Sequence, residues 1–154
     1  MNLLFDTNII LAVVRDKSGH LLMQYLNPSE DLVYVSFASV AEAQSIAFQN
    51  HWGYTKMQIL EDFFNSVRII NLSDMLLPTY IGIDAYSQKN HPEYTAYPFQ
   101  TPRNMGKNDL WIAATASLLN LKLVTTDSDF THLNGVFLSL QNVSTSDIQA
   151  IIKN

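Results

Sequence analysis

The chain has 154 residues, 47% of them hydrophobic, with five Gly, five Pro and no Cys. This length and composition support one folded domain with an ordinary core, and they exclude a disordered chain and a disulfide framework. The net charge of −5, from 14 Asp and Glu against 9 Lys and Arg, argues against a broad basic surface that coats nucleic acid. We therefore expect a single domain over residues 1–154.

The N-terminal residues indicate neither export nor membrane insertion. Residues 1–6 contain no basic leader, and an acid already stands at the sixth position. The apolar stretch 110–121 is interrupted by polar residues and is too short to span a bilayer. We expect a cytoplasmic protein that does not contact a membrane.

Apolar runs of strand length alternate with longer segments of helical period. In chain order, strands are predicted at residues 3–5, 32–35, 68–72 and 121–125, with a fifth at 136–138. Helices are predicted at 9–26 with a break at Ser18-Gly19, around 40–47, around 57–64, from Ser73 to about Gln88, from Asn108 to 119, and after Ser146. Asn8 is the predicted cap of the first helix.

The alternation of strands and helices predicts the fold class. Strands that lead repeatedly into helices of ten or more residues indicate parallel pairing with right-handed crossovers. We expect an α/β fold with a mostly parallel sheet of four to five strands flanked by helices. Residues 89–106 contain three Pro and a Gly and are predicted to form a loop. Because this loop is longer than most connections, we expect it to have a role.

Four acids are predicted to lie at one edge of the sheet. Asp6 ends the first strand and Glu42 lies in the first turn after the second. Asp109 begins the helix after the loop, and Asp127 follows the fourth strand. Ligands of open parallel sheets bind beyond the carboxyl ends of the strands, so these acids should converge on one crevice. Clustered carboxylates repel one another unless a cation lies among them, and Mg²⁺, which prefers oxygen ligands, could activate water there for phosphodiester hydrolysis.

Each acid also has a purely structural explanation. Asp6 could cap the first helix, Asp109 could complement a helix dipole, and Asp127 could be a turn residue. Glu42 stands three residues after Ser39, which is the spacing of a capping box. Four such positions on one predicted edge nevertheless favour an acidic metal crevice over four unrelated structural roles.

An ordered set of motifs in this sequence resembles a known family. The motifs are Asp6-Thr7-Asn8, Ser36 with Glu42, the run 108–114, and the run 125–130. Together, from residue 3 to about 139, they resemble a PIN domain, in particular the VapC-type toxins of type II toxin–antitoxin systems. The resemblance implies a three-layer α/β/α sandwich and a Mg²⁺- or Mn²⁺-dependent endoribonuclease.

The same resemblance implies roles for individual residues. It assigns catalysis and metal binding to four acids: Asp6, Glu42, Asp109 and Asp127. It assigns supporting roles behind the metal ligands to four further residues: Thr7, Asn8, Thr125 and Asp129.

Residues outside these motifs have more ordinary interpretations. Arg103 and Lys107 are candidate contacts with RNA phosphates, and the alternative is a solvated charged loop. Three aromatic residues either fold the loop onto the body, which we favour, or stack on unpaired RNA bases: Tyr94, Tyr97 and Phe99. Trp111 is predicted to lie in the core. The four histidines show no zinc-site spacing and are predicted at the surface or at caps: His20, His51, His91 and His132.

The predicted function is hydrolysis of RNA phosphodiester bonds by the toxin of a toxin–antitoxin pair. The alternative is a catalytically inactive PIN-like module that binds metal or RNA. A haloacid-dehalogenase-like phosphatase is less favoured, because that chemistry needs a second acid where this chain has Asn8. A receiver-like module is also less favoured. It would need an acid pair after the first strand and a Lys after the last, whereas this chain has the single Asp6 there and Lys122 stands at the start of its strand. For a toxin, the expected partners are RNA, a small antitoxin protein and a second copy in a homodimer.

The proposed acids account for most of the negative charge. Without the four, the chain carries 10 acids against 9 Lys and Arg, a net charge of −1. One bound Mg²⁺ would change the total from −5 to −3. RNA binding should therefore depend on the metal and on a few local cations, and the metal-free protein should bind RNA weakly.

Overall fold

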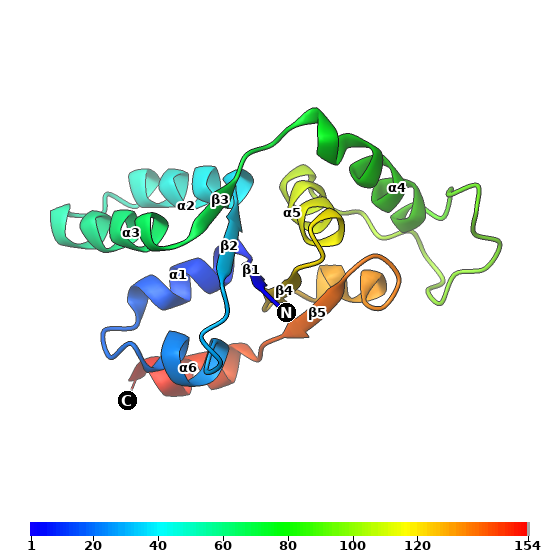
Figure 1. Ribbon diagram of the computed structural model, residues 1–154. Helices are drawn as coiled ribbons and strands as arrows, with labels where there is room; N and C mark the ends of the chain where they lie inside the picture. The colour runs from blue at the N-terminus through cyan, green and yellow to red at the C-terminus, as the bar shows by residue number, and fades with distance from the viewer. Residues whose placement is uncertain (154) are drawn as a thin grey trace.

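Five parallel strands form the centre of the computed structural model, which describes residues 1–153 (Figure 1). The strands are β1 (Leu3–Phe5), β2 (Val33–Ser36), β3 (Arg68–Ile70), β4 (Lys122–Thr125) and β5 (Ser139–Asn142). They lie in the order β3-β2-β1-β4-β5, and every neighbouring pair is parallel. The predicted parallel sheet is therefore confirmed.

Helices cover both faces of this sheet. The longer ones are α1 (Thr7–Arg15), α2 (Phe37–Gln49), α3 (Tyr54–Ser66), α4 (Leu77–Ser87), α5 (Lys107–Leu118) and α6 (Thr145–Lys153). Short helical segments are η1 (Leu21–Leu26), η2 (Asp74–Leu76) and η3 (Ser128–Leu133). In Figure 1, α1, α2 and α3 lie on one side of the strands, and α4 and α5 lie on the other. This is the three-layer α/β/α arrangement. Within residues 1–153, the helices are all too short or too polar to cross a membrane.

Alternation along β1 builds the two halves of the core. Successive side chains of a strand point to opposite faces of the sheet. Leu3 and Phe5 belong to the apolar cluster that includes buried residues of α1 and α3. Leu4, between them, belongs to the cluster built from α4 and α5. Both faces of the sheet are therefore buried, as is usual for parallel sheets.

The first helix begins two residues earlier than predicted, at Thr7, and its cap is Asp6 instead of Asn8. The Thr7 amide donates to Asp6 Oδ1 at 2.7 Å, and α1 starts at Thr7. Asn8 is already inside the helix. The prediction was wrong because the acid that ends β1 also takes the capping position. The predicted break after this helix is confirmed, and Gly19 there has a positive φ of 77°.

The fifth strand lies at 139–142 and not at 136–138. The amides of Val136 and Phe137 both donate to the Leu133 carbonyl, so this apolar run forms a turn. Leu138 is buried in the cluster beside α4 and α5. The apolar residues fill the core from a turn, and the polar strand that follows pairs with β4 at the edge of the sheet.

Candidate functional site

The carboxyl ends of β1 and β4 bring Asp6 and Asp127 to the same edge of the sheet. β1 pairs with β4 in parallel, with Phe5 opposite Val124. The Thr125 hydroxyl, at the end of β4, donates to Asp6 Oδ2 at 2.7 Å. The same hydroxyl oxygen accepts a hydrogen bond from the Asp127 amide at 3.0 Å. Thr125 therefore joins the two acids through one hydroxyl group.

Asp6 is buried, with a relative exposure of 4%. Its two oxygens accept hydrogen bonds from the Thr7 amide and the Thr125 hydroxyl. Burial raises the pKa of Asp6 above its ordinary value although these hydrogen bonds oppose it, and the charges of Glu42 and Asp127 raise it further. A carboxylate in such a place gains from a neighbouring cation.

Asp109 is half-buried and lies among like charges. It lies in the first turn of α5, where a carboxylate also complements the helix dipole. Burial raises the pKa of Asp109 to about 7, and so do the charges of its neighbours Asp6, Asp127, Glu42 and Asp129. These five acids, which we call the acidic edge, are therefore close enough to interact electrostatically.

Three members of the acidic edge come together most tightly. Asp109, Asp127 and Asp129 each offer one carboxylate oxygen, and these oxygens lie within 4.8 Å of one another. Asp127 caps η3, and its Oδ1 accepts a hydrogen bond from the Asp129 amide at 2.9 Å. Asp129 thus lies beside two predicted metal ligands, closer than a supporting position would require.

Glu42 faces the same edge from α2. It lines a hollow of about 520 Å³ together with Gly106, Lys107, Asn108 and Asp109. Glu42 lies in the second turn of α2, one turn beyond the predicted place, because the helix already begins at Phe37. The sequence did not single out Gly106, which lies directly before α5 and beside the Asp109 carboxylate.

The capping-box explanation of Glu42 is wrong. The cap of α2 is Ser36, whose side chain accepts a hydrogen bond from the Ala38 amide at 3.2 Å. Ser39 is a buried residue within the helix and cannot form the box with Glu42. The structural explanations of Asp6 and Asp127 hold, since both cap helical segments, but capping uses only part of each carboxylate.

The donor set of the acidic edge fits a hard divalent cation. Carboxylate oxygens are the ligands that Mg²⁺ prefers, at about 2.1 Å, so two ligands on opposite sides of the ion lie about 4.2 Å apart. Ligands on adjacent corners of the octahedron lie about 3 Å apart, so the oxygens of Asp109, Asp127 and Asp129, within 4.8 Å of one another, would move closer together to share one ion. The hydroxyl of Thr7, the residue after Asp6, is buried without a hydrogen-bond partner among the described residues.

A family comparison identifies the domain. The family described as PIN domain matches residues 3–136. The chain belongs to the PIN-domain family. No curated protein sequence matches it.

Solved structures with the same fold include several complexes. VapBC2 from Rickettsia felis bound to a promoter DNA fragment has a TM-score of 0.70 and 23% identity, covering 92% of this chain and 98% of the other. VapBC-1 from nontypeable Haemophilus influenzae has a TM-score of 0.67 and 22% identity, covering 92% and 98%. A toxin-antitoxin complex from Klebsiella pneumoniae has a TM-score of 0.60 and 21% identity, covering 88% and 92%. At these identities the likeness shows the shared PIN fold.

The other predicted site residues contact different parts of the structure. Lys107 lines the hollow of Glu42 and Asp109. Asn8 lines a separate hollow of about 280 Å³, together with Thr126 and residues of α1 and α6. The Arg103 guanidinium donates hydrogen bonds to η3, which follows Asp127.

The long loop of this PIN domain folds onto its body, as the favoured interpretation predicted. Tyr94, Tyr97 and Phe99 surround the buried ring of Tyr86, with centroids 4.8, 5.2 and 5.5 Å away. Phe137 contacts the same ring at 5.2 Å. We call these five residues and His132 the aromatic cluster. The loop is the light-green segment between α4 and α5 in Figure 1.

His132 is not at the surface, so that prediction was wrong. Its exposure is 8%, its ring stacks on Tyr86 at 6.4 Å, and its Nε2 is 2.7 Å from the Ser87 hydroxyl. Burial and, to a smaller extent, the charge of Arg103 together lower the pKa of His132 to about 4. Trp111 also differs from expectation, because it is only partly buried and packs against Tyr80 at 4.5 Å.

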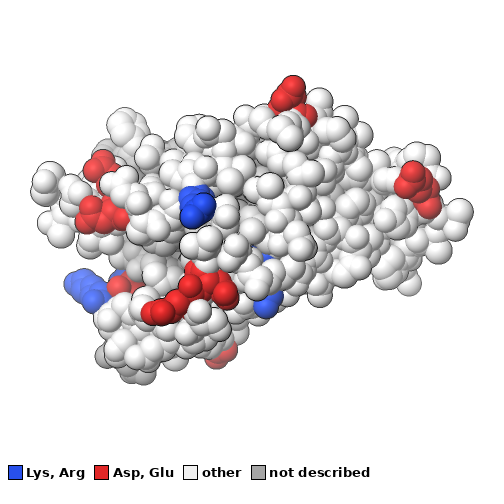
Figure 2. Space-filling view, viewed as in Figure 1, with Lys and Arg blue, Asp and Glu red and all other residues white. Residues whose placement is uncertain are grey.

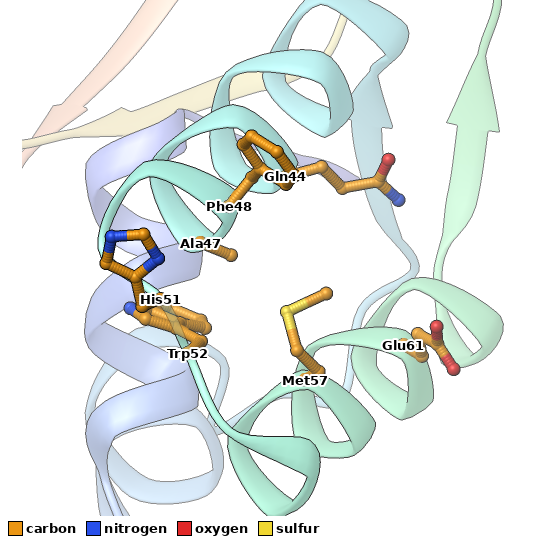
Figure 3. A pocket seen from close by; sticks show the side chains of 7 residues that line it. All are labelled: Gln44, Ala47, Phe48, His51, Trp52, Met57 and Glu61. Atoms are coloured by element: carbon orange, nitrogen blue, oxygen red, sulfur yellow. The ribbon is translucent and has the colours of Figure 1, made fainter.

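The cavity of about 640 Å³ in Figure 3 lies away from the acidic edge. It separates α2 from α3, and its lining residues are Gln44, Ala47, Phe48, His51, Trp52, Met57 and Glu61. In Figure 3 the Met57 side chain points into the space below Phe48. This lining has one carboxylate, Glu61, beside His51 and Gln44 and lacks a group of carboxylates that could hold a cation, so the acidic edge is the better candidate for a hydrolytic site.

Proposed function

We propose that this PIN domain is a metal-dependent endoribonuclease and the toxin of a toxin–antitoxin pair. The observation that carries the proposal is the grouping of Asp109, Asp127 and Asp129, with oxygens within 4.8 Å of one another, beside the buried Asp6. Membership of the PIN-domain family supports the nuclease activity.

The acidic edge would hold Mg²⁺ or Mn²⁺ through Asp6, Glu42, Asp109 and Asp127, with Asp129 as a further ligand. When bound, such a cation supplies a Lewis acid that activates water and stabilises charge on the phosphate. Thr125 keeps Asp6 oriented through the hydrogen bond to Oδ2 at 2.7 Å.

Lys107 is the cation best placed to contact an RNA phosphate, because it lines the same hollow as Glu42 and Asp109. Figure 2 shows a face on which Lys and Arg occur as separate spots among mostly uncharged atoms. RNA binding therefore depends on the metal and on local contacts such as Lys107, with Arg103 as a second candidate. Unpaired RNA is the favoured substrate, because a strand outside a helix can place its phosphate at the acids.

The proposed partners follow from the toxin function. The structural neighbours include VapBC2 bound to promoter DNA and a toxin-antitoxin complex. We propose that a small antitoxin binds and inhibits this chain, and that the chain forms a homodimer. The absence of Cys fits the reducing cytoplasm, which remains the expected location.

The test is RNA cleavage by the purified protein with Mg²⁺ or Mn²⁺. The wild type should cleave RNA, and EDTA should stop it. Asp6→Asn and Asp109→Asn should each lower the cleavage rate by about 100-fold or more, because each removes a carboxylate that holds the cation. Asp74→Asn changes an exposed acid on η2 and is the matched control. Cleavage at the wild-type rate by both site variants would contradict the mechanism, and a folded wild type that binds the metal but cuts no RNA would favour the inactive binding module.

A further inference from the structure

The peptide between Asp127 and Asp129 is held from outside the acidic edge. Arg103 Nη2 donates to the Ser128 carbonyl oxygen at 3.2 Å and to Thr131 Oγ1 at 3.4 Å. The Thr131 hydroxyl itself donates to the Ser128 oxygen at 2.8 Å. The Ser128 carbonyl therefore accepts two hydrogen bonds from side chains that do not belong to the acidic edge.

The opposite side of this peptide group holds Asp127. The Ser128 oxygen and the Asp129 amide belong to one planar peptide unit. That amide donates to Asp127 Oδ1 at 2.9 Å. A rotation that broke the bonds to the Ser128 oxygen would also turn the amide away from Asp127. Hydrogen bonds to the carbonyl also polarise the N–H and strengthen its donation.

Arg103 is itself held between the end of α4 and the start of α5. Its amide donates to the carbonyl of Ser87, the last residue of α4, at 2.7 Å. Four residues later α5 begins at Lys107 and carries Asp109 in its first turn. Phe99 and Tyr97, packed on Tyr86, fix the loop that leads to Arg103. Arg103 thus connects η3 with the segment that places Asp109.

We propose that Arg103 and Thr131 are positioning residues that orient the Asp127–Asp129 segment against Asp109, so that the carboxylates are gathered before a cation binds. This inference rests on the proposed metal-dependent function. Three carboxylates this close repel one another and would separate without a rigid support. Holding them in place beforehand removes the cost of gathering them and so tightens metal binding.

The experiment measures Mn²⁺ affinity by calorimetry, without RNA. Thr131→Val removes the hydroxyl at constant shape and charge, and Arg103→Lys keeps the positive charge but loses the guanidinium geometry. Each should weaken Mn²⁺ binding by roughly 10-fold, as removal of a residue that supports metal ligands does. The double variant should bind about as weakly as the weaker single variant, because both side chains act on one carbonyl. Arg68→Lys, at an exposed position of β3, should bind like the wild type.

A second measurement separates positioning from the other roles of these residues. The Mn²⁺ concentration that gives half-maximal RNA cleavage should rise by the same factor as the dissociation constant. An unchanged Mn²⁺ affinity with a raised KM for RNA would overturn the inference and make Arg103 a phosphate contact. An unchanged affinity with a lower unfolding free energy would overturn it in favour of a purely structural role.

The outcome for the wild type separates this inference from the proposed function. If the wild type binds Mn²⁺ and cleaves RNA while both variants keep its affinity, the positioning role fails and the proposed function stands. If the wild type binds no Mn²⁺, both fail together.

Discussion

At the acidic edge burial raises the pKa of Asp109 to about 7, whereas in the aromatic cluster burial lowers the pKa of His132 to about 4. The segment η3 links the two regions, since it follows Asp127 of the acidic edge and contains His132 of the aromatic cluster. Burial thus favours the neutral form of each group, but the two regions meet that cost differently.

The aromatic cluster pairs His132 with neighbours in the chain through its ring face and Nε2, while its Nδ1 is buried without a hydrogen-bond partner among the described residues. Neutral His132 stacks on Tyr86 and shares a hydrogen bond of 2.7 Å with Ser87. The acidic edge instead places Asp109 among like charges. The aromatic cluster therefore contributes to the stability of the fold. The acidic edge lowers that stability, and a bound cation would restore it.

The largest expected change in unfolding free energy comes from a substitution in the aromatic cluster. Tyr86→Ala removes a ring that is 1% exposed and contacts four other aromatic rings of the cluster and His132. We expect a loss of about 3–5 kcal/mol in unfolding free energy, because the removed ring leaves a cavity. Urea unfolding followed by circular dichroism measures it.

Tyr54→Ala is the matched control for that variant, because Tyr54 is 84% exposed. It should change the unfolding free energy by less than about 0.5 kcal/mol. If Tyr86→Ala is no more damaging than Tyr54→Ala, the aromatic cluster is not the stabilising region of the pair.

The next effect has the opposite sign and belongs to the acidic edge. The pKa of Asp109 is raised from 3.8 to about 7 in the folded state. Between these pH values the folded protein therefore holds a proton on Asp109 that the unfolded chain has lost. The charged form therefore destabilises metal-free protein fully above pH 7, and this penalty disappears as the pH falls from 7 towards 4. Asp109→Asn should stabilise the metal-free protein at pH 8 by about 1–2 kcal/mol, less than the full shift implies because solvent screens a partly exposed group.

Urea unfolding in EDTA at pH 8 and at pH 4.5 tests this expectation. The unfolding free energy of Asp109→Asn should exceed that of the wild type at pH 8, and the two values should be nearly equal at pH 4.5. Asp74→Asn, an exposed acid, should show no such difference. A variant that is less stable than the wild type at pH 8 would show that Asp109 contributes to folding instead of opposing it.

The sequence predicts the acidic edge better than the aromatic cluster for a physical reason. Asp6 and Asp127 follow strands directly, and parallel strands must end at one edge, so local position determined where these acids lie. The hydrogen bond between Thr125 and Asp6 follows from the same pairing of β1 with β4. Only the tertiary structure shows that Asp129 joins them or that Arg103 holds Ser128.

The aromatic cluster depends on contacts that no local pattern contains. His132 and Ser87 are 45 residues apart, and nothing in the sequence near either one indicates that the other is its partner. β5 was placed too early for a related reason. Its strand is polar, so the apolar run before it gave the stronger pattern although that run forms a turn.

The smallest expected effect is the loss of stability at low pH that His132 of the aromatic cluster causes. The pKa of His132 is depressed to about 4 from 6.5, so the unfolded chain takes up its proton first as the pH falls. Neutral His132 therefore contributes stability that is present above pH 6.5 and is lost between pH 6.5 and 4. Asp109 contributes with the opposite sign over much of this range, so the wild-type pH profile alone shows only their difference.

His132→Gln isolates the histidine contribution. The Gln amide can reach the Ser87 hydroxyl near the place of Nε2 but does not titrate. From pH 7 to pH 5, the wild type should lose about 1 kcal/mol more unfolding free energy than this variant, since each has the same Asp109. Urea unfolding of both proteins in EDTA across this range measures the difference. Parallel profiles would mean that His132 takes up its proton equally readily in the folded and the unfolded chain, and that burial in the aromatic cluster does not favour the neutral ring.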